Sequence, residues 1–191
     1  MTKALFFDID GTLVSFETHA IPASTIEALT IAHEKGIKIF IATGRPKAII
    51  NNLADIQDRG LIDGYITMNG AYCFVGDEVI YKSAIPAGEV RALAKVCEQK
   101  GYPCIFVGEH TISVCQPNKL VHDIFYDFLH VDEIPVKTFE EAVQEEIFQM
   151  TPFVTVEEET EIQPQIPNCE SGRWFPAFAD ITAKGNTKQK G

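Results

Sequence analysis

Short apolar runs recur in the first third of the chain, separated by segments with helical spacing. Residues 4–7 form a continuous apolar run, and residues 37–42 and 65–68 repeat the pattern. Runs of this length without alternation are typical of strands that are buried on both faces of a parallel sheet. The sequence therefore predicts three parallel strands joined by helices, which make a right-handed, doubly wound α/β sheet.

Two helices are expected between these strands. Ser24 and Glu27 have the spacing of a capping box, and apolar residues follow at helical intervals up to Gly36, which occupies the position of a C-terminal cap glycine. Pro46, shortly after the second apolar run, is a residue type that commonly opens a helix. Both helices are therefore predicted to connect neighbouring parallel strands.

After residue 70 the pattern changes. Residues 72–75 and 79–82 are short strands joined through Gly76-Asp77, a combination typical of a hairpin. The sequence then predicts a helix at 88–100, strands at 104–107 and 112–115, and a helix at 120–129. We interpret residues 84–177 as an α+β cap domain inserted into a core of residues 1–83 and 178–191, with residues 179–182 returning to the core.

The composition is that of a folded protein with little affinity for nucleic acid or membranes. Apolar residues make up 46% of the 191 residues, enough for a substantial core, and the formal net charge is −11. No basic patch offsets this charge, so phosphate backbones and anionic lipids would be repelled. The apolar run near Met1 is too short for a signal peptide or a membrane span. Five cysteines without a Cys-x-x-Cys pair indicate reduced thiols in a cytoplasmic protein.

Several common catalytic patterns do not occur in the sequence. The five histidines show no metal-ligand spacing, and no serine lies in a Gly-x-Ser-x-Gly elbow. The Gly-x-x-x-x-Gly-Lys loop of nucleotide hydrolases is also missing, which excludes an ordinary P-loop enzyme.

Asp8 and Asp10 are the first candidates for chemistry. They follow a predicted buried strand and lie two residues apart, so both side chains should project on the same side at the carboxyl edge of the sheet, where open parallel sheets bind ligands. Two close carboxylates repel, which favours protonation of one of them or binding of a hard cation. Asp8 could then attack phosphorus, while Asp10 protonates the leaving oxygen and later activates water.

Two structural alternatives exist for this pair of acids. One is a hairpin turn at Asp10-Gly11, which would need a second strand at once, whereas residues 12–19 are predicted as a loop. The other is a calcium loop, which would need glycine at its sixth position, where the chain has Leu13. Both fit the sequence less well than a catalytic pair.

The segment Thr43-Gly44-Arg45 is the second candidate, as a phosphate-binding loop. It follows the second predicted strand and precedes the helix expected at Pro46. A hydroxyl and free backbone N–H groups at a helix N-terminus bind a dianion, and glycine lets the backbone approach closely. The same residues could equally be an ordinary N-cap, a turn and a solvated side chain.

Lys188 is the third candidate, as the fixed positive charge of a site that gathers a carboxylate and a phosphate. Lys184 and Lys190 lie close to it in the sequence, and a lysine near a chain end is usually a solvated side chain. Its position alone therefore does not distinguish the two roles.

Three segments together resemble the motifs of the haloacid dehalogenase-like hydrolases. Residues 6–12 (FFDIDGT) resemble the first motif, residues 41–45 (IATGR) the second, and residues 185–188 (GNTK) the lysine-bearing third. The segment at 69–71 (NGA) and an insert between the second and third motifs are similar to the Cof-type branch, which has a large α/β cap and includes hexose phosphate phosphatases.

The resemblance implies a Rossmann-like core and a magnesium-dependent phosphatase. Its substrate would be a small phosphorylated metabolite, in particular a sugar phosphate, hydrolysed through an aspartyl-phosphate intermediate. By the same resemblance Asp8 is the nucleophile and a Mg²⁺ ligand, and Asp10 is the general acid/base and a ligand through its backbone carbonyl.

The remaining roles follow from the second and third motifs. The resemblance assigns Thr43 and Gly44 to the phosphoryl group, and Lys188 to a bridge between nucleophile and phosphate. These residues supply positioning and charge compensation, which is most of what phosphoryl transfer requires. Arg45 and Trp174 are candidates for contacts with the substrate, with the cap closing over the site.

The resemblance also implies a fourth motif, Gly-Asp-x-x-x-Asp, that follows Lys188 and holds the remaining acidic Mg²⁺ ligands. The printed sequence ends at Gly191 without it. We therefore expect a longer polypeptide. In a protein of these 191 residues alone, Mg²⁺ would bind weakly, and residues 4–7 would form an exposed apolar edge strand.

Two other functions remain open from the sequence. A phosphomutase of the same branch would use the same pair of acids but transfer the phosphoryl group between two hydroxyls. A truncated, inactive chain could instead bind a phosphorylated ligand without turning it over. Receiver domains also phosphorylate an aspartate, but the paired acids and the inserted domain argue against them. The sequence does not predict the oligomeric state.

Overall fold

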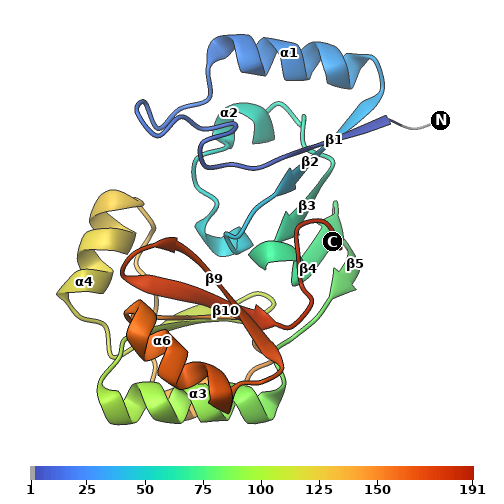
Figure 1. Ribbon diagram of the computed structural model, residues 1–191. Helices are drawn as coiled ribbons and strands as arrows, with labels where there is room; N and C mark the ends of the chain where they lie inside the picture. Colours follow the sequence, from blue (N-terminus) through green and yellow to red (C-terminus); the bar gives the residue numbers. More distant parts are fainter. Residues whose placement is uncertain (1–2) are drawn as a thin grey trace. The chain divides into compact units, whose positions relative to one another are not determined.

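The computed structural model describes residues 3–191, which divide into two compact units (Figure 1). The first unit comprises Met1–Lys82 with Thr187–Gly191, and the second comprises Ser83–Asn186.

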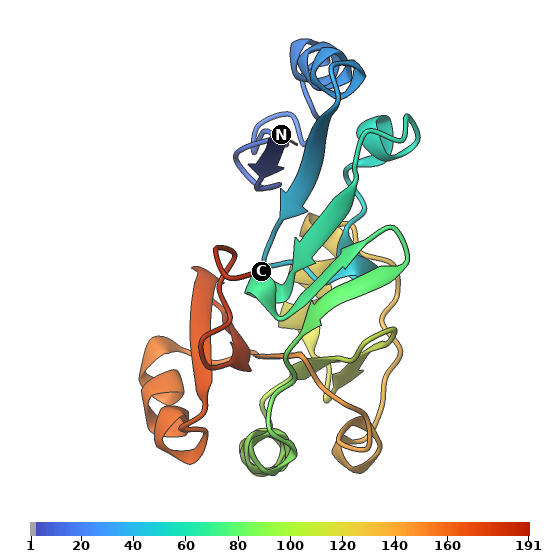
Figure 2. The ribbon, with the colours of Figure 1, turned by 90° about the vertical axis from the view of Figure 1, so that its right-hand side faces the viewer.

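The first unit is built on a mixed sheet with the strand order β1-β2-β3-β4-β5. The parallel strands are β1 (Lys3–Phe7), β2 (Ile37–Ala42) and β3 (Gly64–Thr67). The antiparallel hairpin strands are β4 (Tyr72–Val75) and β5 (Glu78–Lys82). These strands lie side by side as the blue to green arrows of Figure 2. The prediction of an α/β fold with a parallel sheet is therefore confirmed.

Helix α1 (Ala23–Glu34) connects β1 to β2, but it does not begin as predicted. Its N-cap is Pro22 and no side chain caps the helix, so the capping box expected at Ser24 and Glu27 is wrong. The helix starts before Ser24, which therefore lies inside its first turn. The prediction for Gly36 is confirmed, because this residue follows the helix with a φ of +75°.

The helix predicted to begin at Pro46 is largely absent from the connection between β2 and β3. The chain instead forms a 3₁₀ turn, η1 (Lys47–Ile49), and one turn of helix, α2 (Ala54–Gln57). Ile50 is extended, with φ −84° and ψ 94°, and ends the first turn. Residues 51 and 52, both asparagine, have low helix propensity and do not restart it. The segment Thr43-Gly44-Arg45, which the sequence suggested as a phosphate-binding loop, therefore does not lie at the start of a long helix.

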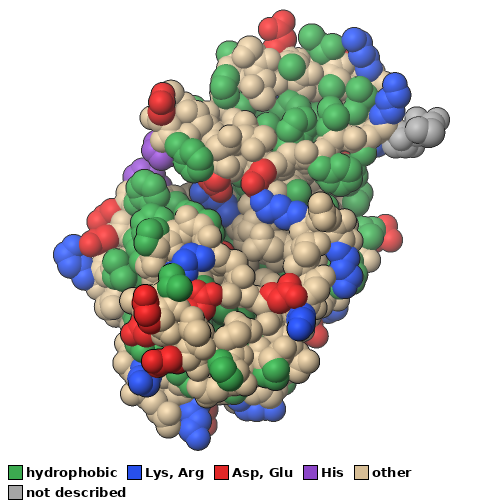
Figure 3. Space-filling model, in the orientation of Figure 1, with side chains coloured by type: hydrophobic (Ala, Val, Ile, Leu, Met, Phe, Trp, Pro, Cys, Tyr) green, Lys and Arg blue, Asp and Glu red, His purple; other side chains and the backbone are tan. Residues whose placement is uncertain are grey.

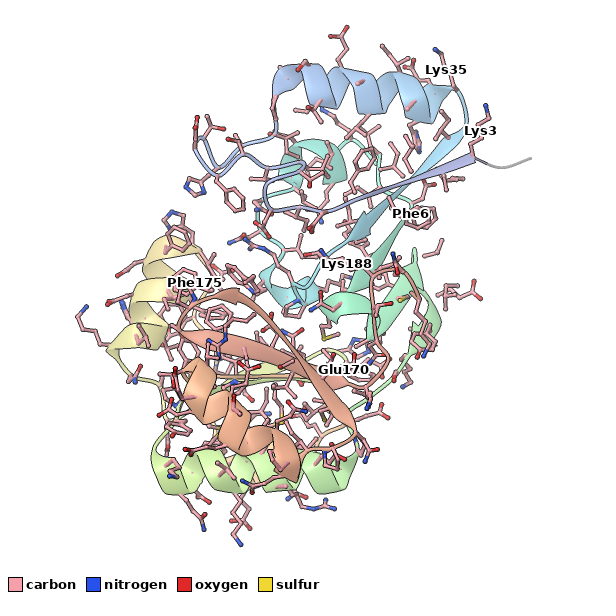
Figure 4. All side chains as sticks on the ribbon, in the orientation of Figure 1. Lys3, Phe6, Lys35, Glu170, Phe175 and Lys188 are labelled. Atoms are coloured by element: carbon pink, nitrogen blue, oxygen red, sulfur yellow. The ribbon has the colours of Figure 1, made fainter. Side chains whose placement is uncertain are left out.

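Strand β1 is an edge strand, and its side chains are less buried than the apolar run predicted. It pairs only with β2, so one side of the strand has no neighbour in the sheet. Leu5 is 40% exposed and Phe6 is 58% exposed, although the Phe6 ring stacks on Phe40 at 4.9 Å (Figure 4). Burial of this strand on both faces is thus wrong for the described residues, whereas an exposed apolar edge is what they show.

The second unit is an antiparallel sheet with the strand order β7-β6-β8-β10-β9. Its strands are β6 (Cys104–Val107), β7 (Ile112–Cys115), β8 (Gln149–Pro152), β9 (Cys169–Phe175) and β10 (Phe178–Ala183). Helices α3 (Ala87–Lys100), α5 (Phe139–Ala142) and α6 (Val156–Ile162) share one apolar cluster with the sheet. The shorter elements are α4 (Lys119–Val121), the π-helix η3 (His122–Phe128), η4 (Gln163–Gln165) and, in the first unit, η2 (Met68–Gly70).

Strand β10 corrects the predicted domain boundary. Residues 178–191 were assigned to the core, but β10 pairs with β8 on one side and β9 on the other, and so lies inside the sheet of the second unit. Its alternate residues Ala179 and Ile181 point into the apolar cluster that this sheet shares with its helices. The chain returns to the first unit only at Thr187.

Two further properties concern the cysteines and helices of the described residues. All five cysteines are free and buried. Within residues 3–191, every helix falls short of the length and apolar content that crossing a bilayer requires.

Candidate active site

Asp8 follows β1 directly and starts a tight turn at the carboxyl edge of the sheet. One of its carboxylate oxygens, Oδ1, accepts the backbone N–H of Ile9 at 2.9 Å. The turn closes when Val14 donates to the Ile9 carbonyl and Gly11, with a φ of +76°, donates to the Val14 carbonyl. The Asp8 side chain remains 41% exposed, so this turn presents a fixed carboxylate to solvent.

Lys188 lies beside Asp8, although 180 positions separate the two in the sequence. The ammonium Nζ of Lys188 is 2.8 Å from Oδ2 of Asp8. Lys188 (labelled in Figure 4) reaches this position from the short C-terminal segment that belongs to the first unit. The structure thus brings together the candidate nucleophile and the candidate cation, while leaving the Asp8 carboxylate accessible.

Asp10 is held by Arg45 in a bidentate ion pair. Nε and Nη2 of Arg45 donate to the two carboxylate oxygens of Asp10 at 2.8 and 2.9 Å. The Arg45 side chain is only 9% exposed, and its Nη1 also donates to the carbonyl of Ile49 at 3.2 Å. Because three donors of one guanidinium are fixed, this pair is more rigid than an ordinary surface ion pair.

Thr43 and Gly44 lie between the end of β2 and Arg45. Thr43 is buried, its N–H donates to the Ile66 carbonyl at 2.8 Å, and its hydroxyl oxygen accepts the Arg45 N–H at 3.0 Å. A Cβ on Gly44 would lie 3.2 Å from the side-chain amide of Asn69. Glycine at this position therefore allows close packing against Asn69, where a Cβ would force the amide to shift by a few tenths of an ångström.

The first-unit residues proposed from the sequence therefore gather at one edge of the sheet. Asp8 and Asp10 supply two negative charges, and Lys188 and Arg45 compensate them with two positive charges. Acidic and basic side chains are interspersed on the face drawn in Figure 3, which shows no broad basic patch. Such a site can hold one phosphoryl group at a nucleophilic carboxylate with a cation beside it.

The donors around Asp8 fit a hard divalent cation. Carboxylate and carbonyl oxygens are the ligands that Mg²⁺ prefers, and the Asp8 carboxylate is partly exposed. Both carboxylate oxygens of Asp10 are engaged by Arg45, so its backbone carbonyl is the oxygen that Asp10 could offer.

Trp174 lies in the second unit, on β9, with its indole half-exposed. Its Nε1–H donates to Oδ2 of buried Asp180 at 3.1 Å, and its ring packs edge-on against Phe178 at 5.1 Å. Thr151 and Gln149 donate to the other oxygen, Oδ1, at 2.8 and 3.0 Å. Burial raises the pKa of Asp180 to about 6, although its three hydrogen bonds act in the opposite direction.

Sequence reasoning missed two of these arrangements. The ion pair between Asp10 and Arg45 joins residues 35 positions apart, and no local pattern indicates it. The hydrogen-bonded group around Asp180 was also missed, although one signal existed, because Asp180 interrupts the apolar positions of a strand.

Comparison with known proteins decides the family. A family model described as haloacid dehalogenase-like hydrolase matches residues 5–191. The chain belongs to the haloacid dehalogenase-like hydrolases. The family expected from the three sequence motifs is thereby confirmed.

The relatives of this family member include solved structures and a curated protein. The subclass IIB sugar phosphatase BT4131 is 76% identical, with a TM-score of 0.94, over 100% of this chain and 73% of that one. The phosphatase BT1666 of Bacteroides thetaiotaomicron is 33% identical, with a TM-score of 0.79, over 98% of this chain and 69% of that one. YkrA of Bacillus subtilis, which carries a phosphatase name, is 29% identical over 100% of this chain and 72% of its own length. These relatives agree on the enzyme class, phosphoric monoester hydrolase.

Proposed function

We propose that this chain hydrolyses sugar phosphates and related small phosphomonoesters, with Asp8 as the nucleophile. The observation that carries the proposal is the pairing of a partly exposed carboxylate, Asp8, with Lys188 at 2.8 Å, at the carboxyl edge of the parallel strands. An ammonium in that place can neutralise both the nucleophile and an incoming phosphoryl group. Sites that transfer a phosphoryl group act mainly through positioning and charge compensation.

The proposed reaction has two steps. A carboxylate oxygen of Asp8 attacks phosphorus, the bond from phosphorus to the sugar oxygen breaks, and Asp10 gives a proton to that oxygen. In the second step Asp10 removes a proton from water, and the water oxygen attacks phosphorus. The bond from phosphorus to the Asp8 oxygen then breaks, which releases inorganic phosphate and restores the Asp8 carboxylate. Thr43 holds a phosphoryl oxygen through its hydroxyl, and Gly44 holds one through its backbone N–H, during both steps.

The ion pair between Arg45 and Asp10 affects the proton transfers of this reaction. Arg45 donates one hydrogen bond to each carboxylate oxygen of Asp10, which fixes the orientation of the carboxylate. Each oxygen keeps a second lone pair, so Asp10 can still exchange a proton with the leaving group while it is held. The role of Arg45 in this proposal is therefore to orient Asp10, and a contact between Arg45 and the substrate remains a prediction.

Magnesium is the proposed cofactor. Asp8 would hold it through a carboxylate oxygen and Asp10 through its backbone carbonyl. When bound, the ion would neutralise developing charge on the phosphoryl oxygens.

A sugar phosphate is proposed as the substrate for two reasons. BT4131, at 76% identity, is described as a sugar phosphatase. In addition, the half-exposed indole of Trp174 is fixed at its N–H by Asp180, and a fixed aromatic face can bind the apolar face of a sugar ring. We further propose a cytoplasmic location, because five buried free thiols suit a reducing compartment.

The test is phosphate release from a panel of sugar phosphates with and without Mg²⁺, for the wild type and for Asp8→Asn. The wild type is expected to turn over only with Mg²⁺, and Asp8→Asn to lose turnover. Rapid acid quenching followed by peptide mass spectrometry should find a phosphorylated Asp8. Isomerisation of the sugar phosphate without phosphate release would identify a phosphomutase instead, and ligand binding without turnover would identify a binding protein.

A further inference from the structure

The segment that follows β3 has an unusual backbone. Met68, Asn69 and Gly70 have φ values of +49°, +53° and +94°, three left-handed residues in a row. Glycine adopts this conformation freely and asparagine tolerates it, but methionine does so at a cost. Strain of this kind persists only where the surrounding structure enforces it, and it is concentrated at functional sites.

One side of this segment is bound to the phosphate-binding loop. The N–H of Asn69 donates to the carbonyl of Thr43 at 3.1 Å, and the N–H of Met68 donates to the carbonyl of Arg45 at 3.3 Å. The side-chain amide of Asn69 lies close to Gly44, where a Cβ would be 3.2 Å from both of its terminal atoms. The segment therefore contacts the loop through two backbone hydrogen bonds and through the packing of one side chain.

The other side packs against the segment that carries Lys188. A Cβ on Gly70 would lie 2.2 Å from the carbonyl oxygen of Thr187 and 2.7 Å from its carbonyl carbon. Since these are backbone atoms, they could make room only by moving the chain next to Lys188. The ammonium of Lys188 is in turn fixed to Asp8 at 2.8 Å.

We propose that Met68–Gly70 is a positioning element that sets the place of Lys188 relative to Thr43 and Asp8. The proposal rests on the function proposed above, because only a site that uses Lys188 and Thr43 together gains from a fixed distance between them. The left-handed turn lets one short segment approach both loops, and the missing side chain at Gly70 lets Thr187 come close.

The test compares two glycines of the first unit. Gly70 and Gly60 both have positive φ, but a Cβ on Gly60 would meet nothing within 4 Å. Gly60→Ala therefore introduces left-handed strain alone, whereas Gly70→Ala also displaces Thr187. At a temperature where both variants are folded, Gly70→Ala is expected to lower kcat about 10²-fold, with a smaller change in KM, and Gly60→Ala to leave kcat within about twofold. Equal kcat values for the two variants would overturn the proposal.

Asn69 offers a second, independent comparison. Asn69→Gly keeps the left-handed backbone and removes the amide, whereas Asn69→Ala removes the amide and opposes the backbone conformation. If backbone geometry positions the loops, Asn69→Ala should lose activity about tenfold and Asn69→Gly should restore most of it. Equal losses in both variants would contradict the positioning role of the backbone.

A readout without turnover separates this proposal from the proposed function. The rate at which acetic anhydride acetylates Lys188, measured by mass spectrometry, reports how strongly the ion pair with Asp8 protects the amine. The rate should increase several-fold in Gly70→Ala, as in the reference variant Asp8→Asn, and stay at the wild-type value in Gly60→Ala. If the wild type released no phosphate, the proposed function would fail, while this difference in acetylation would still support the positioning element. An unchanged rate in Gly70→Ala would refute it.

Discussion

The two units of the chain surround their carboxylates with different partners. In the first unit, Asp8 and Asp10 are partly exposed, and each contacts a permanent cation, Lys188 or Arg45. In the second unit, Asp180 is buried and accepts hydrogen bonds from three neutral donors. A carboxylate with a cation and access to solvent can react and exchange ligands, whereas one surrounded by neutral donors mainly fixes its neighbours. This difference distinguishes the candidate catalytic carboxylates of the first unit from the structural carboxylate of the second.

The largest effect is expected for the proton-transferring acid of the first unit. Asp10→Asn should reduce turnover of a sugar phosphate about 10²–10⁴-fold, because an amide cannot give or take the proton. The matched control is Asp63→Asn, which removes another carboxylate of the same unit that forms an ion pair, in this case with Lys38 at 2.6 Å. The control is expected to keep turnover within about twofold. Similar losses in both variants would mean that the first unit depends on its ion pairs only for folding.

The second prediction concerns the pH dependence of stability in the second unit. Burial raises the pKa of Asp180 from 3.8 to about 6, so between these pH values the unfolded chain loses the proton while the folded chain keeps it. Ionisation of Asp180 therefore lowers the free energy of unfolding as pH rises from about 4 to 6, by roughly 3 kcal/mol in all, with no further change above that.

Asp180→Asn tests this prediction. Urea unfolding of the variant and the wild type at pH 4, 5, 6 and 7 should show the variant gaining roughly 3 kcal/mol relative to the wild type across that range. The fluorescence of Trp174, the single tryptophan, reports on the unit concerned. A difference that stays constant with pH would show that Asp180 titrates normally in the folded protein.

A smaller effect is expected when the ion pair of Asp10 is weakened rather than removed. Arg45→Lys keeps the charge but loses the bidentate geometry, and should lower kcat about tenfold, because Asp10 is then held in more than one position. Arg59→Lys, at an exposed position of the same unit, is the matched control and should leave kcat unchanged. An unaltered kcat in Arg45→Lys would remove Arg45 from the mechanism.

The smallest effect is expected for one hydrogen bond of the second unit. Trp174→Phe removes the indole N–H donor to Asp180 and keeps an aromatic ring beside Phe178. Unfolding followed by circular dichroism should show a loss of about 1 kcal/mol at neutral pH. Because the KM for sugar phosphates is measured on the same variant, a change in KM without a change in stability would assign Trp174 to the substrate rather than to the fold.

Much of the fold could be predicted because its signals are local. The strands at 37–42, 104–107 and 112–115 have the predicted bounds, since short apolar runs between turns admit few other structures. The helix after Pro46 could not be predicted correctly, because its residues are shared between two short turns that pack separately into the core. Strand β10 was predicted in the wrong unit for a related reason, since the apolar pattern of a strand does not indicate which of two sheets it will join.

The sequence by itself determined the family and the residue types of the candidate site. Three motifs carry that information because each is a short, contiguous segment whose backbone and side chains act together, as in the turn after Asp8. The third motif already implied that Lys188 meets Asp8, and the structure supplies the distance between them. Only the tertiary structure decided the other contacts: Arg45 with Asp10, and Met68–Gly70 with both loops. Contacts between distant segments depend on the packing of the whole unit, and their energies are small differences that no local pattern records.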